Sequence, residues 1–119
     1  MDKVFEELRS IMAGMTASLD VKHDEPDNYY VDTFHTMKNG KRLWFGAVQI
    51  KKNYVSYHLM PVYVNPELLT DMSPGLKKRM QGKSCFNFKV LDKLLFKELE
   101  RLTQRSIQDY LSKGFLHDS

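Results

Sequence analysis

In the stretch Lys41–Met60, KRLWFGAVQIKKNYVSYHLM, which is rich in aromatic and β-branched residues, every second position from Trp44 to Ile50 and from Val55 to Leu59 is apolar or glycine, and the positions between them are mixed. Such alternation is typical of β-strands with one buried face, and Lys52-Asn53 predicts a tight turn between two strands. The pairs expected on the apolar face are Ile50–Val55, Val48–Tyr57 and Gly46–Leu59, and Trp44 is expected in the core with them. The opposite face is mixed, so we expect an antiparallel hairpin with one side on the core.

A third strand is predicted at Tyr29–Thr36, joined to this hairpin through Asn39-Gly40. Asn-Gly favours a two-residue hairpin turn. That turn sets a register that extends the same apolar face through the pairs Tyr29–Ile50, Val31–Val48 and Thr33–Gly46. Two turns placed independently agree on the buried face, which favours a three-stranded meander.

Helical periodicity begins the chain and ends it. Residues 3–19 form the first predicted helix, with Asp2 as N-cap, and Asp20–Asn28 is predicted to be a polar loop. The last helix begins after Asp92, runs for about 20 residues and ends at Gly114.

Between them, two short helices start at Asn65-Pro66 and Ser73-Pro74, and Gly82 suits the C′ position of the second. A fourth strand is predicted at Ser84–Lys89. The expected fold is α+β in the order α-β-β-β-α-α-β-α: an antiparallel sheet of about four strands with helices packed on one face.

Composition narrows the class of protein. The 119 residues fit a single domain, 1–119, with 42% hydrophobic and 28% charged residues. A net charge of +3 is too small to indicate nucleic-acid binding, and we do not expect that function. One cysteine excludes an internal disulfide and favours the cytoplasm, and no apolar run is long enough for a membrane span.

The mixed sheet face is the candidate binding site. The expected register aligns Asp32, Ala47 and His58, which puts the outer two backbones roughly 10 Å apart with the small Ala47 between them. We expect a shallow groove with Ala47 as its floor, lined by Tyr30, Asp32, Phe45, Tyr54, Ser56 and His58, with Lys83 and Lys89 adding positive charge. The alternatives are a solvated face, and a homodimer interface that buries Phe45, Met60 and Tyr54.

Other candidate chemistry has a plainer interpretation. The basic run from Lys77 to Lys83 attracts anions but also suits a solvated helix end. Cys85 near His58 has no motif of a thiol nucleophile. His23, His35 and His117 lack metal-ligand spacing. The acids Glu6, Glu7, Asp20, Asp24, Glu25 and Asp27 are oxygen ligands for a hard cation but are loosely spaced.

Two blocks, FGAVQIKKNYVSYHLMPVYVNPELL and SPGLKKRMQGKSCFNF, resemble the YdhG-like family, a bacterial domain of unknown function. The resemblance spans residues 28–112 and implies a small α/β domain with an antiparallel sheet. One branch of that family is a proposed frataxin-like intracellular iron chaperone, a role that would need surface carboxylates.

We therefore expect a non-enzymatic cytoplasmic module that binds a small ligand or a protein partner on the open sheet face. No catalytic residue, resident cofactor or membrane partner is expected. The alternatives are an iron chaperone, for which iron would be the cargo, and a dimerising structural domain with no small ligand.

Overall fold

The first helix, α1, spans Asp2–Thr16 in the computed structural model, which describes residues 1–116. Its buried residues recur at the period that places one helical face on a core: Val4, Phe5, Leu8, Met12 and Thr16. Met1 rather than Asp2 is the N-cap residue, and Asp2 lies in the first turn. The helix ends at Thr16, so the predicted extension to residue 19 is wrong.

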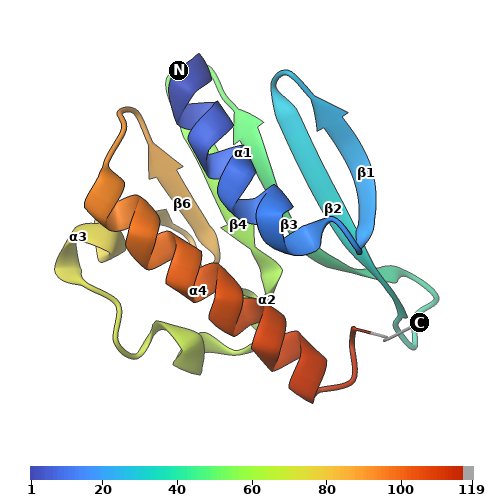
Figure 1. Ribbon diagram of the computed structural model, residues 1–119. Helices are drawn as coiled ribbons and strands as arrows, with labels where there is room; N and C mark the ends of the chain where they lie inside the picture. The colour runs from blue at the N-terminus through green and yellow to red at the C-terminus, as the bar shows by residue number, and fades with distance from the viewer. Residues whose placement is uncertain (117–119) are drawn as a thin grey trace.

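Six strands follow: β1 (Asp20–Glu25), β2 (Asn28–Thr36), β3 (Arg42–Ile50), β4 (Val55–Leu59), β5 (Met80–Gln81) and β6 (Cys85–Phe88). They form one antiparallel sheet in the order β1-β2-β3-β4-β6-β5 (Figure 1). The α+β class, the meander β2-β3-β4 and the later strand β6 are confirmed. The expected number of about four strands is wrong, because β1 and β5 at the two edges were not predicted.

Strand β1 replaces the loop expected at Asp20–Asn28. All its residues except Asp20 are exposed, so it shows none of the apolar alternation that identifies a half-buried strand. Charged side chains are typical of edge strands because they oppose pairing with another chain. Its backbone pairs with β2, from Asp20–Asp32 to Glu25–Asn28.

Four helical segments complete the chain: α2 (Met60–Val64), the 3-10 helix η1 (Pro66–Leu69), α3 (Pro74–Lys77) and α4 (Lys93–Ser112). Three predicted caps are confirmed by side chains that accept a backbone N–H: Asn65, Ser73 and Asp92. Helix α2 was not predicted. Gly82 is not a helix C′ residue; its positive φ of 74° lies in the turn between β5 and β6.

The β3–β4 hairpin has the predicted register from Gly46–Leu59 to Ile50–Val55. The β2–β3 hairpin does not. Lys41 O accepts from Met37 N (2.8 Å) and Gly40, with φ 84°, donates back to Met37 O (2.9 Å). This is a three-residue connection with glycine in the left-handed region, instead of the two-residue turn that Asn-Gly favours.

The altered connection and two irregularities in the pairing, one between Asp32 and Thr36 and one between Val31 and Asp32, move β2 along β3. Tyr29 pairs with Val48 and Val31 with Gly46, a displacement of two residues that keeps the predicted face buried. The next pair is Asp32–Trp44, so Phe45 is an extra residue in β3. This extra residue changes the face on which Phe45 and Trp44 lie. Phe45 faces the core and is fully buried, whereas Trp44, which was expected in the core, lies on the open face and is only partly buried.

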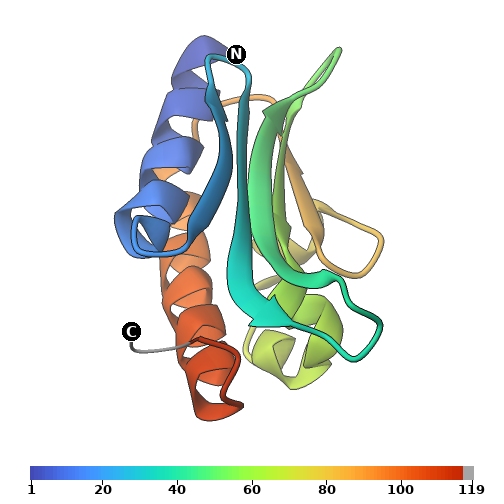
Figure 2. The ribbon, with the colours of Figure 1, turned by 90° about the vertical axis from the view of Figure 1, so that its right-hand side faces the viewer.

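Helices α1 and α4 cover one face of the sheet, as the edge view in Figure 2 shows. Phe88 of β6 packs edge-on against Phe96 of α4, with ring centroids 5.0 Å apart. Hydrogen bonds of 2.7 Å also join the layers, from Thr16 to Tyr29 and from Tyr57 to Thr103. Every buried side-chain nitrogen and oxygen among the described residues has a partner.

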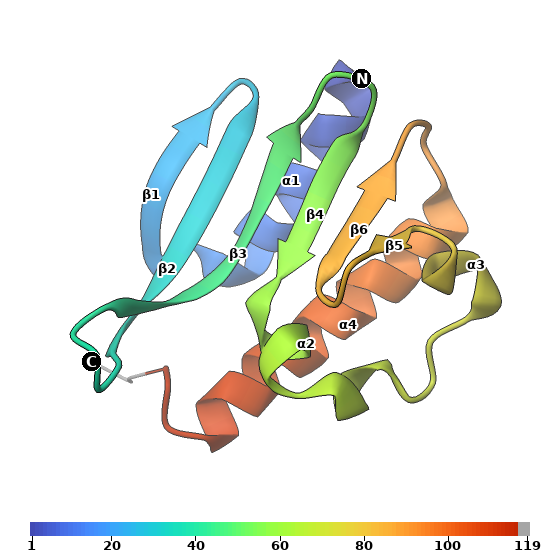
Figure 3. The same cartoon turned by 180° about the vertical axis from the view of Figure 1, so that it is seen from behind.

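No helix within residues 1–116 covers the opposite face of the sheet. Seen from behind in Figure 3, strands β1 to β6 lie in front of α1 and α4, and the segment with α2, η1 and α3 runs along one end. That segment packs against α4. Within residues 1–116, no helix is both long and apolar enough to cross a bilayer.

Candidate functional site

A row of side chains crosses the uncovered face on four adjacent strands. Tyr30 pairs with Ala47, Ala47 with His58, and His58 with Cys85. Residues directly opposite each other in an antiparallel sheet share a face, so these four project to the same side. Tyr30 therefore occupies the place predicted for Asp32, and the expected Asp32–Ala47–His58 row is wrong.

Trp44 completes this row because the bulge turns it to the open side. Its ring stacks on Tyr30, with centroids 5.2 Å apart and planes 15° apart, and lies 5.4 Å from His58. Its Nε1–H donates to the Gly46 carbonyl at 2.9 Å, which fixes the indole over its own strand. We call Tyr30, Trp44 and His58 the aromatic row.

The aromatic row fills the space where a groove was predicted. Ala47, the expected groove floor, has no exposed surface because larger side chains lie around it. At the β1 edge His23 meets Tyr30 edge-on, with centroids 6.0 Å apart, so the ring contacts extend to β1. The face is better suited to contact with another surface than to enclosing a small molecule.

The other predicted site residues are dispersed. Asp32 lies beside the aromatic row, opposite Trp44, and Ser56 lies on the same face but is 1% exposed. Tyr54 belongs to the β3–β4 turn and Lys83 to the β5–β6 turn. Phe45 does not belong to the site: it is buried in the core, where its ring meets Tyr110 edge-on at 5.9 Å.

The pKa shifts of His58 and Cys85 on this face favour their neutral forms. Burial lowers the pKa of His58, and the positive charge of Lys51 lowers it further. Burial raises the pKa of the Cys85 thiol, which donates to Asn87 Oδ1 at 3.3 Å. A nucleophilic cysteine needs a lowered pKa, so this environment opposes thiol catalysis.

Charge divides the open face into two halves. Segments 50–60 and 79–89, which contain β4, β5 and β6, hold five basic residues and no acid: Lys51, Lys52, Arg79, Lys83 and Lys89. On the β1–β2 half, Asp20 forms ion pairs with Lys22 (3.0 Å) and Arg42 (2.9 Å). Burial, as the largest cause, raises the pKa of Asp32 there. The excess positive charge therefore lies at the β4–β6 side of the aromatic row.

The acids considered for iron do not converge. Asp24 forms a bidentate pair with Arg9 of α1 (2.8 and 2.7 Å), and Glu25 lies 3.0 Å from His23 on β1. Throughout residues 1–116, no cluster of three or more His, Cys, Asp or Glu side chains is placed to hold a metal ion. His117 lies outside the described residues.

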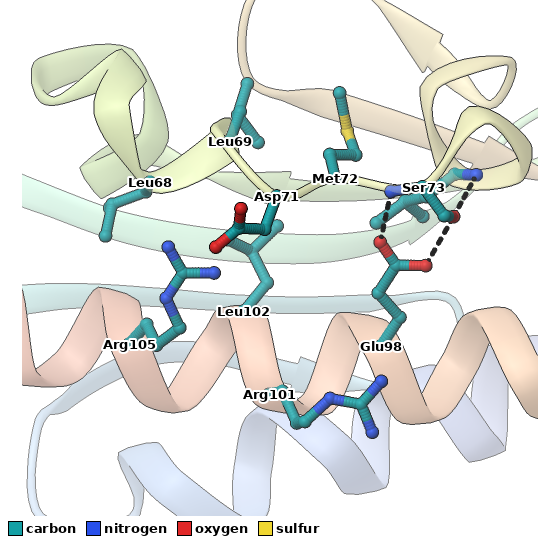
Figure 4. Close-up of a pocket in the computed structure, with 10 residues that line it drawn as sticks. Leu68, Leu69, Asp71, Met72, Ser73, Glu98, Arg101, Leu102 and Arg105 are labelled. Carbon is teal, nitrogen blue, oxygen red and sulfur yellow. Dashed lines mark hydrogen bonds between the residues drawn. The ribbon is translucent and has the colours of Figure 1, made fainter.

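A cleft that the sequence did not indicate lies on the helical side, between α4 and the segment from η1 to α3 (Figure 4). Its volume is about 290 Å³. The wall is apolar and includes Leu68, Leu69, Met72, Leu76 and Leu102, while Asp71, Arg101 and Arg105 stand at the rim. The cleft forms only when η1, α3 and α4 come together, and periodicity within each segment carries no signal for it.

Comparison with known proteins does not assign the chain to a family. No family model, no curated protein and no solved structure matches it. The resemblance to the YdhG-like family therefore stays a prediction.

Proposed function

We propose that the protein is a non-enzymatic binding module whose open sheet face recognises an acidic segment of a partner protein. The observation that carries this proposal is the aromatic row, which lies on an uncovered face beside a half with five basic residues and no acid. Tryptophan and tyrosine are the side chains most often found at the energetic centre of protein interfaces. We also propose the reducing cytoplasm as its setting, because Cys85 is a free thiol.

The arrangement supports a protein partner over a small molecule for two reasons. The space over Ala47 is occupied by Trp44, so a small ligand would have little surface to bury. A partner protein can instead pack directly on the aromatic row without any rearrangement of its side chains. The carboxylates of the partner then lie near Lys51, Lys83 and Lys89. Long-range attraction between unlike charges speeds such an encounter and weakens as salt is added.

The test uses two fluorescein-labelled peptides, one rich in glutamate with two phenylalanines and one with glutamine in place of every glutamate. Fluorescence anisotropy should show binding of the glutamate peptide alone, weakening as salt rises. Trp44, the only tryptophan in the chain, should report the same event through its intrinsic fluorescence. Equal binding of both peptides, or of neither, would refute the proposal.

Matched variants locate the contact. Lys83→Gln should weaken binding of the glutamate peptide, whereas Lys38→Gln, in the exposed β2–β3 turn, should leave it unchanged. His58→Ala should weaken it without altering the salt dependence, because the lost contact is apolar. A concentration-dependent dimer in sedimentation experiments that Trp44→Ala abolishes would show that a second copy occupies the face, and would overturn the acidic partner.

A further inference from the structure

The cleft in Figure 4 combines an apolar wall with guanidinium groups that have no partner among the described residues. Leu76 is 1% exposed and Leu102 4% exposed, so the wall is part of the core surface. Arg101 and Arg105 are four residues apart on α4 and so lie on neighbouring turns of one helical face. Neither makes a hydrogen bond or ion pair within residues 1–116.

The two acids at the cleft differ in their hydrogen bonding. The Glu98 carboxylate accepts two hydrogen bonds from Ser73, one from the backbone N–H (2.8 Å) and one from Oγ (2.6 Å), and these bonds hold the start of α3 against α4. Asp71 is exposed and makes no such bond. In Figure 4 its carboxylate faces Arg105 across the cleft, and the two form no ion pair.

We propose that this cleft binds a small amphipathic carboxylate, with the carboxylate on Arg105 and the hydrocarbon body on the leucines of the wall. A guanidinium group matches a carboxylate with two parallel N–H donors. A cavity of about 290 Å³ is at the small end of ligand pockets, which limits the body to about eight carbons. Arg101 adds positive charge, and the negative charge of Asp71 repels the ligand carboxylate and weakens its binding.

Octanoate is the probe, with 1-octanol and octylammonium as ligands of equal chain length and different charge. Titration followed by the NMR methyl signals of Leu68 and Leu102 should show saturable binding of octanoate, weaker binding of octanol and none of octylammonium. Octanol binding as tightly as octanoate would mean that the cleft is only an apolar pocket and would overturn the carboxylate site.

Charge variants at exposed positions, where folding is not at risk, separate the roles. Arg105→Gln should weaken octanoate binding by roughly tenfold or more, as expected for loss of a charge-assisted pair. Arg79→Gln removes the same charge outside the cleft and should change nothing. Asp71→Asn should tighten binding. If Arg105→Gln and Arg79→Gln behave alike, or Asp71→Asn weakens binding, the proposed site is wrong.

Discussion

Gly46→Ala is the substitution that most directly tests the geometry of the bulge. Gly46 faces the core opposite Leu59, and a Cβ built on it lies 2.4 Å from the carbonyl oxygen of His58 and 2.8 Å from Met12 Cε. The methionine tip is able to move, because it is the end of a flexible side chain. The carbonyl belongs to the neighbouring strand and is held by the sheet.

The size of the effect follows from these distances. The closest ordinary approach of carbon to a carbonyl oxygen is about 3.3 Å, so the strands must separate by about 0.9 Å (3.3 less 2.4) at this point. Overpacking of a rigid site costs typically 1–3 kcal/mol and sometimes more. We therefore expect Gly46→Ala to lower the free energy of unfolding by about 3 kcal/mol, measured by urea denaturation followed by Trp44 fluorescence.

Gly14→Ala is the matched control. Gly14 is exposed in α1 and a Cβ there meets nothing within 4 Å, so alanine should raise stability by about 0.5–1 kcal/mol through its helix propensity. Adding Met12→Ala to Gly46→Ala should not restore stability, because the carbonyl contact remains. Full restoration, or a Gly46→Ala variant as stable as the parent, would refute the geometry of the bulge.

Three further outcomes are expected in urea unfolding. Leu59→Ala should cost about 2–5 kcal/mol, since the side chain is fully buried and its cross-strand partner is a glycine; a cost below about 1 kcal/mol would mean a solvent-facing position. Tyr57→Phe should cost about 1 kcal/mol by removing its 2.7 Å bond to Thr103, and an unchanged free energy would argue against that bond. The pKa of His58 is lower in the folded protein than its ordinary value of 6.5, so at a pH between these two values the unfolded chain binds more protons than the folded one. The free energy of unfolding should therefore rise with pH over this range, and His58→Gln should reduce that rise.

The parts of the fold that local sequence determines were predicted correctly. The β3–β4 register follows from a two-residue turn with an apolar residue or glycine at every second position on both sides of it. Asn65, Ser73 and Asp92 act as caps through bonds within a few residues. The β2–β3 register depends on the extra residue Phe45 and on a second irregularity between Asp32 and Thr36, and no local pattern marks either of them. One extra residue was enough to exchange Trp44 and Phe45 between faces.

The candidate site was predicted in part for the same reason. Tyr30 and His58 lie on the open face as predicted. Both pair with Ala47, which lies beyond the bulge, where the predicted alternation between the two faces still holds. Ala47 was expected to be an exposed groove floor because Trp44 was assigned to the core, whereas Ala47 has no exposed surface. Strand β1 was not predicted because it has no alternating apolar residues. An edge strand is held by backbone pairing with its neighbour and does not need an apolar face of its own.

The position of α4 sets the order in which the chain can become stable during synthesis. Residues of α4 touch β3 through Tyr110, β4 through Thr103 and β6 through Phe96, and α4 also lies beside α1. Until residues 93–112 leave the ribosome, the inner face of the sheet lacks the helix that contacts β3, β4 and β6. A nascent chain that stalls before this point exposes Tyr57, Phe86 and Phe88, so chaperone binding should be strongest on chains arrested there and fall once α4 has emerged.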